Sequence, residues 1–127
     1  MSVERKNYPH LANPVGPYVH AVKHAGLVFV SGITALGTPA QGQSLPKQAE
    51  AIFSQIRSIA SAEGASLKAL LKVTIFVTSF ESIVQLRAVL FKEYGENLPA
   101  SSLVQVAGLF SPEINIEIEA VLAVPAV

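Results

Sequence analysis

The 127-residue sequence contains no cysteine. This absence excludes disulfide bonds, thiolate nucleophiles and zinc sites built on thiolates, and it fits a reducing compartment. Charged residues are also few, at 14% of the chain, and nine Lys and Arg balance nine Asp and Glu. No basic stripe is present, which argues against a protein that binds nucleic acid by neutralising phosphates.

The sequence also lacks long apolar runs. The first residues, MSVERKNYPHLANP, have no apolar core of signal-peptide length, and no run approaches the length that spans a membrane. We therefore expect a soluble, cytoplasmic protein with one domain over residues 1–127, of which residues 1–12 form an extended N-terminal segment. Half of the residues are nevertheless hydrophobic. This is high for a small monomer, so we expect some apolar surface to lie in a subunit interface.

Hydrophobic periodicity predicts the order strand, strand, helix, strand, helix, strand, strand. The predicted segments are two strands around a turn at His24-Ala25-Gly26, a helix from Pro46 to Gly64, a strand over 70–77, a helix from near Ser79 to near Gly95, and strands over 103–107 and 114–124. Two helices can cover only one face of a single sheet, which predicts an α+β domain. We expect the other sheet face to pack on a partner subunit.

Arg87 is the charged residue that fits this pattern least. At 100° per residue it falls near the middle of the apolar face of the second helix, which consists of Phe80, Ile83, Val84, Leu86, Leu90, Phe91 and Tyr94. A buried guanidinium needs a partner, because desolvating an unpaired charge is costly. Glu117 and Glu119 lie two apart on the last predicted strand, and we expect one of them to meet Arg87.

The chemistry of such a pair stays open at this point. It could be a structural ion pair, or Arg87 could extend along its stem to the edge of the helix. It could also form a small pocket in which Arg87 binds an anion and a glutamate handles protons or water. Other chemistry has less support: His10, His20 and His24 lack the spacing of metal ligands, and no glycine motif for phosphate is present, so we expect neither a metal nor a nucleotide cofactor.

Five segments of the chain carry a family signature. The segments NPVGPYVHAV (13–22), VFVSG (28–32), LLKVTIFVTSF (70–80), LPASSLVQV (98–106) and INIEIEAVLAV (114–124) resemble, in order and spacing, the Rid family, also called YjgF. The resemblance implies a chorismate-mutase-like fold in a homotrimer, with the sheets around the interior and pockets in the clefts between subunits. It also implies hydrolysis of reactive imines and enamines to keto acids and ammonia, without a metal or cofactor.

The resemblance also assigns site residues. Tyr18, Gly32 and Glu117 match the family pocket, and Glu117 and Tyr18 would orient water toward the imine carbon. The departures concern the remaining pocket positions. The arginine that grips the substrate carboxylate in deaminating members is Ser101 here, the cysteine two positions later is Leu103, and the glutamine that commonly follows Ser-Gly is Ile33.

Arg87 stands where many members have an asparagine on the second helix. We hypothesise that it reaches the cleft and partly replaces the missing clamp, because a guanidinium orients a carboxylate as well as attracting it. The competing interpretation is a pocket retuned for a neutral or differently shaped ligand. The alternatives to imine hydrolysis are a member that binds a small metabolite without turnover, and a ribonuclease or translation inhibitor. We expect neither a membrane nor a nucleic acid as a partner.

Overall fold

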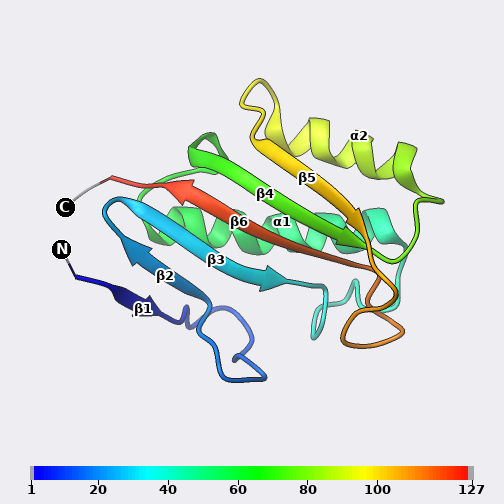
Figure 1. The fold of residues 1–127 in the computed structure, drawn as a ribbon, viewed down its shortest axis with the longest axis horizontal. Helices are drawn as coiled ribbons and strands as arrows, with labels where there is room; N and C mark the ends of the chain where they lie inside the picture. Colours follow the sequence, from blue (N-terminus) through cyan, green and yellow to red (C-terminus); the bar gives the residue numbers. More distant parts are fainter. Residues whose placement is uncertain (1, 126–127) are drawn as a thin grey trace.

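The structure is a computed structural model that describes residues 2–125. Six strands form one mixed sheet, and two helices pack on one of its faces (Figure 1). The elements are β1 (Glu4–Lys6), β2 (Ala21–His24), β3 (Leu27–Ile33), α1 (Leu45–Ala62), a short 3₁₀ helix (Leu67–Ala69), β4 (Leu70–Val77), α2 (Ile83–Tyr94), β5 (Ala100–Gln105) and β6 (Ile116–Ala123). This arrangement confirms the predicted α+β class, with both helices on the same face of one sheet.

The strands lie in the order β1-β2-β3-β6-β4-β5. The pair β4–β5 is parallel, and the other four pairs are antiparallel. The turn between β2 and β3 consists of Ala25 and Gly26, which both have positive φ angles of 52° and 78°. A two-residue turn with this geometry matches the twist of the strands that it joins, so the predicted hairpin is confirmed.

The N-terminus of helix α1 is stabilised by a capping side chain and by a proline in the first turn. The Ser44 side chain accepts a hydrogen bond from the Lys47 backbone N–H, and Pro46 lies in the first turn, where no N–H is needed. The face that α1 turns to the sheet is fully buried and consists of Ala49, Ile52, Phe53, Ile56, Ile59 and Ala60. These six residues are the ones that helical periodicity predicts for the core face.

Strand β6 divides its side chains between the two faces of the sheet. Ile116, Ile118, Ala120 and Leu122 are buried in the core beneath the helices. Glu117, Glu119 and Val121 alternate with them and therefore point to the opposite face, which neither α1 nor α2 covers. We call this second surface the open face. It also carries Phe29, whose side chain is 48% exposed, beside Val121.

Gln48 fixes the start of β6 from inside the protein. Its buried amide nitrogen donates to the carbonyl oxygens of Gln43 (2.9 Å) and Glu113 (3.0 Å), and its amide oxygen accepts from the Asn115 N–H (2.9 Å). All of these partners are backbone groups that would otherwise lose hydrogen bonds on burial. The side chain therefore joins the N-terminal end of α1 to the backbone two residues before Glu117.

Three boundaries differ from the prediction. β1 was not predicted, because its Glu-Arg-Lys sequence has no apolar alternation and it is held by antiparallel pairing with β2. β5 begins at Ala100 rather than near residue 103, and α2 begins at Ile83 rather than near Ser79.

Neither α1 nor α2 is long and apolar enough to cross a membrane, and the same holds for every helix among the described residues.

Candidate functional site

Glu117 projects from the open face beside an irregularity in β3. Val30 pairs with Ala120 and Ile33 with Ile118, so β3 has one more residue than β6 over this interval. The extra residue makes a β-bulge at Ser31 and Gly32, a feature that is over-represented next to active sites. A Cβ atom built on Gly32 would lie 2.7 Å from the carboxyl carbon of Glu117. Glycine at position 32 therefore leaves the space that the Glu117 carboxyl group occupies.

The surroundings of Glu117 favour its protonated form. Partial burial raises the pKa of this carboxyl, and the negative charge of Glu119 raises the pKa further. The ion pairs found within residues 2–125 are Lys6–Glu63, Lys23–Glu63 and Arg57–Glu93, none of which includes Glu117. A half-buried carboxyl with a raised pKa and no cationic partner in this part of the chain is suited to exchanging protons with a ligand.

Tyr18 lies on the loop that precedes β2 and faces the same region. Its hydroxyl oxygen accepts a hydrogen bond from the Val15 N–H at 3.3 Å, which leaves the hydroxyl proton available for a ligand. The tyrosine ring packs closely on Gly16, where a Cβ atom would lie 3.2 Å from Cε1 of the ring. The glycine of the PxGPY segment thus allows the ring to lie back over its own loop.

His20 anchors this loop to the sheet. Its Nδ1 accepts from the Tyr8 N–H at 2.8 Å, so Nε2 carries the proton and donates to the Ala12 carbonyl at 2.8 Å. The Ser31 hydroxyl also donates to the Val19 carbonyl at 2.7 Å. Both nitrogens of the imidazole are therefore engaged in holding the loop that carries Tyr18.

These groups line an open groove with a volume of about 330 Å³. The lining residues are Val15, Gly16, Tyr18, Ser31, Gly32, Phe110 and Glu117. Of the residues that the resemblance indicates, the structure brings Tyr18, Gly32 and Glu117 together. Val15, Ser31 and Phe110 were not singled out from the sequence, and Phe110 lies on a loop whose position no periodic pattern predicts.

The expected ion pair between Arg87 and Glu117 or Glu119 is wrong within this chain. Arg87 is exposed on α2, which packs on the helix side of the sheet, whereas both glutamates point to the open face. The apolar stripe of α2 is broader than the surface that covers it, so Leu86 is buried while Val84 remains 71% exposed. Arg87 lies on the uncovered part of the stripe.

Ser101 and Leu103 do not join the groove either. On β5 they are paired with Val73 and Ile75, two core residues, and therefore point to the helix side of the sheet. The residue of this strand segment that shares the face of Glu117 is Ser102, whose hydroxyl accepts from the Lys72 ammonium at 2.8 Å. Within residues 2–125 of a single chain, the groove therefore contains no cationic side chain.

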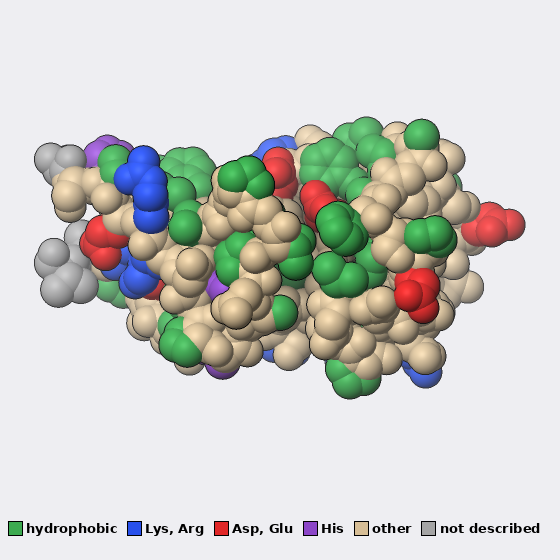
Figure 2. Space-filling model, turned by 90° about the horizontal axis from the view of Figure 1, so that it is seen from below, with side chains coloured by type: hydrophobic (Ala, Val, Ile, Leu, Met, Phe, Trp, Pro, Cys, Tyr) green, Lys and Arg blue, Asp and Glu red, His purple; other side chains and the backbone are tan. Residues whose placement is uncertain are grey.

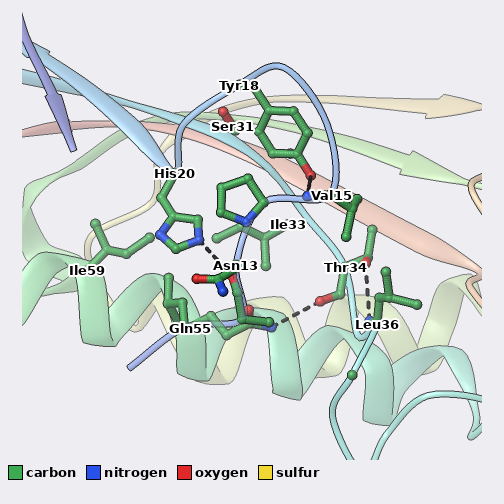
Figure 3. Close-up of a pocket in the computed structure, with 15 residues that line it drawn as sticks. Asn13, Val15, Tyr18, His20, Ser31, Ile33, Thr34, Leu36, Gln55 and Ile59 are labelled. Atoms are coloured by element: carbon green, nitrogen blue, oxygen red, sulfur yellow. Dashed lines mark hydrogen bonds between the residues drawn. The ribbon is translucent and has the colours of Figure 1, made fainter. Parts of the chain in front are cut away.

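Ile33 lines a second cavity, on the helix side of β3 (Figure 3). Its volume is about 280 Å³, and it lies between α1, the end of β3 and the loop that carries Tyr18. Val15, Tyr18, Ser31 and Gly32 line both this cavity and the groove of Glu117. The two hollows are therefore neighbours that share one wall.

Comparison with known proteins agrees with this fold. The model of the family described as endoribonuclease L-PSP matches residues 9–124. The chain belongs to this family, which contains the Rid (YjgF) proteins that the sequence resembles, and its fold is the chorismate-mutase-like α+β fold.

Individual relatives cover most of the chain. A RutC family protein of Pyrococcus abyssi is 30% identical over 112 residues, which are 85% of this chain and 87% of the relative. The 2-iminobutanoate/2-iminopropanoate deaminase of Dermatophagoides farinae is 26% identical over 119 residues, 91% and 92% of the two chains. The crystal structure of RidA from Psychrobacter sp. PAMC 21119 superposes with a TM-score of 0.78 at 30% identity, covering 87% of this chain and 91% of that one.

Proposed function

We propose that this protein hydrolyses reactive imines or enamines to keto compounds and ammonia, with Glu117 as the group that moves protons. The observation that carries the proposal is the half-buried Glu117 carboxyl, seated against Gly32 beside the Tyr18 hydroxyl, with a pKa raised by burial and by Glu119. The relative named as a 2-iminobutanoate/2-iminopropanoate deaminase supports the same reaction class.

The chemistry needs a base that later becomes an acid. Glu117 takes a proton from a water molecule as the water oxygen bonds to the imine carbon, and the C=N double bond becomes a single bond. Glu117 then returns that proton to the nitrogen, which gives a carbinolamine with one hydroxyl and one amino group. Glu117 next moves the hydroxyl proton to the amino nitrogen as the C–N bond breaks and the C=O bond forms, and a keto compound and ammonia leave. A raised pKa suits this role, because the same carboxyl must accept a proton and later donate it. Tyr18 donates its hydroxyl proton to the water or the substrate.

We also propose that the working form is a homotrimer in which another copy completes the groove. The open face exposes apolar side chains that one chain leaves uncovered, among them Phe29 at 48% and Val104 at 42%. Arg87 is exposed and takes part in none of the ion pairs among the described residues. In this proposal Arg87 of a neighbouring copy supplies the positive charge for a substrate carboxylate, while Ser101 and Leu103 line the cleft from that neighbour's β5 edge.

The second candidate function is binding of a small metabolite without turnover. It is favoured by the groove lining, which has no cationic side chain from the described residues, and by Ser101 in place of the expected arginine.

The name of the family also contains the word endoribonuclease. On the side seen in Figure 2, however, Lys and Arg gather mostly toward the end that carries β1, and the middle is a mixture of hydrophobic side chains, uncharged polar or backbone atoms and a few acidic groups. This distribution gives little support to a phosphate-binding surface.

A coupled assay tests the proposal. An amino-acid oxidase generates 2-imino acids with acidic, aliphatic and aromatic side chains, and the loss of imine is followed with and without this protein. We expect accelerated loss with the parent, a loss of at least roughly a hundredfold in that acceleration for Glu117→Gln, and no change for the exposed control Glu96→Gln. No acceleration for any substrate, with keto acids still bound, would identify the binding function instead.

The clamp is tested separately with two substitutions on the same helix. Arg87→Ala is expected to raise KM for imino acids by roughly tenfold or more, because a charge-assisted bidentate contact is lost. Lys92→Ala removes an exposed charge about one turn further along α2 and is expected to change KM little. Equal KM values for the parent and Arg87→Ala would rule out the clamp and leave the role of Glu117 intact.

A further inference from the structure

The cavity on the helix side of β3 is apolar in its chemistry. Leu11, Ile33 and Leu36 contribute hydrocarbon surface to it, and none of its lining residues is Lys, Arg, Asp or Glu. An engineered protein cavity of about 150 Å³ lined by apolar side chains binds benzene, so a volume of about 280 Å³ is large enough for a branched aliphatic group.

Several polar groups around this cavity already have hydrogen-bond partners within the protein (Figure 3). Both ring nitrogens of His20 are bonded to the backbone, and the amide nitrogen of Gln55 donates to the Thr34 carbonyl at 3.0 Å and the Ala51 carbonyl at 3.3 Å. The Thr34 hydroxyl accepts from the Leu36 N–H at 3.1 Å. A charged ligand group placed here would lose water and would find no charged side chain in the lining, which disfavours it.

The cavity adjoins the groove of Glu117 at the end of β3. β2 pairs with β3 only as far as Val30, so the described part of the chain places no strand beside Gly32 and Ile33 on that side. Gly32 has no side chain, and it lines both hollows together with Val15, Tyr18 and Ser31. A ligand that lies across the Gly32 backbone can therefore place one end beside Glu117 and the other end against Ile33.

We propose that this cavity receives the side chain of the substrate, and that it selects uncharged aliphatic side chains of three or more carbons over methyl and over acidic ones. This inference rests on the proposed function, because the reacting carbon is placed at Glu117. It assigns Ile33 and Leu36 as specificity-determining residues. Each additional buried methylene is expected to improve affinity about fourfold (about 0.8 kcal/mol) until the cavity is filled.

The test compares two leucine-to-phenylalanine substitutions. Leu36→Phe adds a ring to the cavity wall, whereas Leu98→Phe makes the same chemical change at a side chain that is 62% exposed and outside both hollows. The readout is the ratio of kcat/KM for the imine with an isobutyl side chain to that for the imine with a methyl side chain. We expect a ratio of roughly ten or more for the parent and for Leu98→Phe, and a ratio near one for Leu36→Phe.

A second substitution guards against a variant that fails to fold. Ile33→Ala enlarges the cavity, and we expect it to shift the preference toward side chains larger than isobutyl. Thermal denaturation confirms that each variant is folded. A ratio that is the same in the parent, Leu36→Phe and Ile33→Ala would overturn the side-chain cavity while leaving imine hydrolysis in place.

Failure of the reaction itself has a different signature. If no imine is hydrolysed, binding of the corresponding 2-oxo acids is measured by calorimetry with the same variants. Affinity that rises with side-chain length in the parent but not in Leu36→Phe would retain the cavity as a side-chain site in a binding protein. Affinity that is independent of side-chain length in the parent would overturn the inference.

Discussion

The carboxyl group of Glu117 occupies the space that a side chain at position 32 would fill. Gly32 does not have a positive φ angle, so conformational freedom is not the reason for glycine at this position. The reason is the close approach of the carboxyl, whose carbon lies 2.7 Å from the point that a Cβ atom on residue 32 would take. The Ser-Gly of the family signature on β3 and the glutamate on β6 therefore depend on each other, because the glutamate carboxyl needs the space that the glycine leaves free.

Gly32→Ala is expected to displace the Glu117 carboxyl and to reduce imine hydrolysis by roughly tenfold or more, because small misplacements of a catalytic group carry large rate penalties. Gly108→Ala is the matched control, since a Cβ atom there meets nothing within 4 Å. Turnover by the coupled assay and the urea midpoint are measured for both. Full activity in Gly32→Ala would show that the position of Glu117 is not critical.

Glu117→Gln is expected to stabilise the protein at neutral pH. Because burial raises the pKa of Glu117 in the folded state, that state binds the proton more tightly than the unfolded chain does. The stability that this proton contributes is complete below the unfolded pKa, near 4.5, and is lost as pH rises through the higher folded pKa. The urea midpoint of Glu117→Gln should therefore exceed that of the parent increasingly as pH rises, whereas exposed Glu96→Gln should follow the parent.

Glu63 is expected to have the opposite pH dependence. Burial alone raises the pKa of Glu63, but hydrogen bonds from Lys6 (2.6 Å), Tyr8 (2.9 Å) and Lys23 (3.2 Å) outweigh that effect and lower it. The stability from this cluster is present above pH 4.5 and is lost as pH falls through the lower folded pKa. Glu63→Gln should cost about 2 kcal/mol at pH 7, less than for a fully buried pair because both lysines reach water.

The measurement is urea denaturation of the parent and Glu63→Gln between about pH 3 and pH 7, a range that spans the titration of a carboxyl group. The difference between the two proteins should shrink toward the acid end, where the carboxyl of the parent becomes protonated. Glu50→Gln, on the exposed side of α1, is the control and should leave the curve unchanged. A constant difference over the whole range would show that Glu63 acts through packing rather than through its charge.

Phe29→Glu is expected to break the proposed trimer. Its side chain is 48% exposed on the open face, and a charge there would be desolvated in any interface that covers this face. Light scattering after gel filtration should give about three times the 13.4 kDa chain mass for the parent and about one chain mass for the variant. Ala62→Glu adds the same charge at the end of α1 and should not change the mass. A monomeric parent would refute the assembly.

Periodicity was sufficient for the elements that alternate strongly. The core faces of α1, β4 and β6 follow directly from Ile and Val at regular spacing, because one face of each is covered by other elements. Leu71 is an exception: the strand pattern places it in the core, but a register shift between Leu70 and Lys72 leaves it exposed. Leu71 is the extra residue of a bulge in β4, because Leu70 pairs with Leu122 and Lys72 pairs with Val121, and local alternation alone does not reveal such an extra residue.

The site was predictable only where a motif fixes both identity and position. Tyr18, Gly32 and Glu117 come from three distant segments, and their meeting depends on β6 lying beside β3. Arg87 was misplaced because an apolar stripe on a helix does not say which part of its width a neighbour covers. Phe110 could not be found from the sequence, since it lies on a loop without a periodic pattern. The Gln48 hydrogen bonds hold only the end of that loop, at Glu113 and Asn115.

The place of β6 in the strand order has a consequence for how the chain acquires its structure. β6 lies between β3 and β4, which are not paired with each other, and it follows the other five strands in the chain. Until β6 emerges from the ribosome, the hairpin β2–β3 and the pair β4–β5 are separate ribbons with exposed apolar edges. Completion of the sheet must therefore wait for β6 and depends on long-range contacts, which slows folding and exposes it to aggregation. Glu117 lies on β6, the strand that joins the two halves of the sheet. A chain without β6 therefore lacks both the complete sheet and the carboxyl that we place at the centre of function.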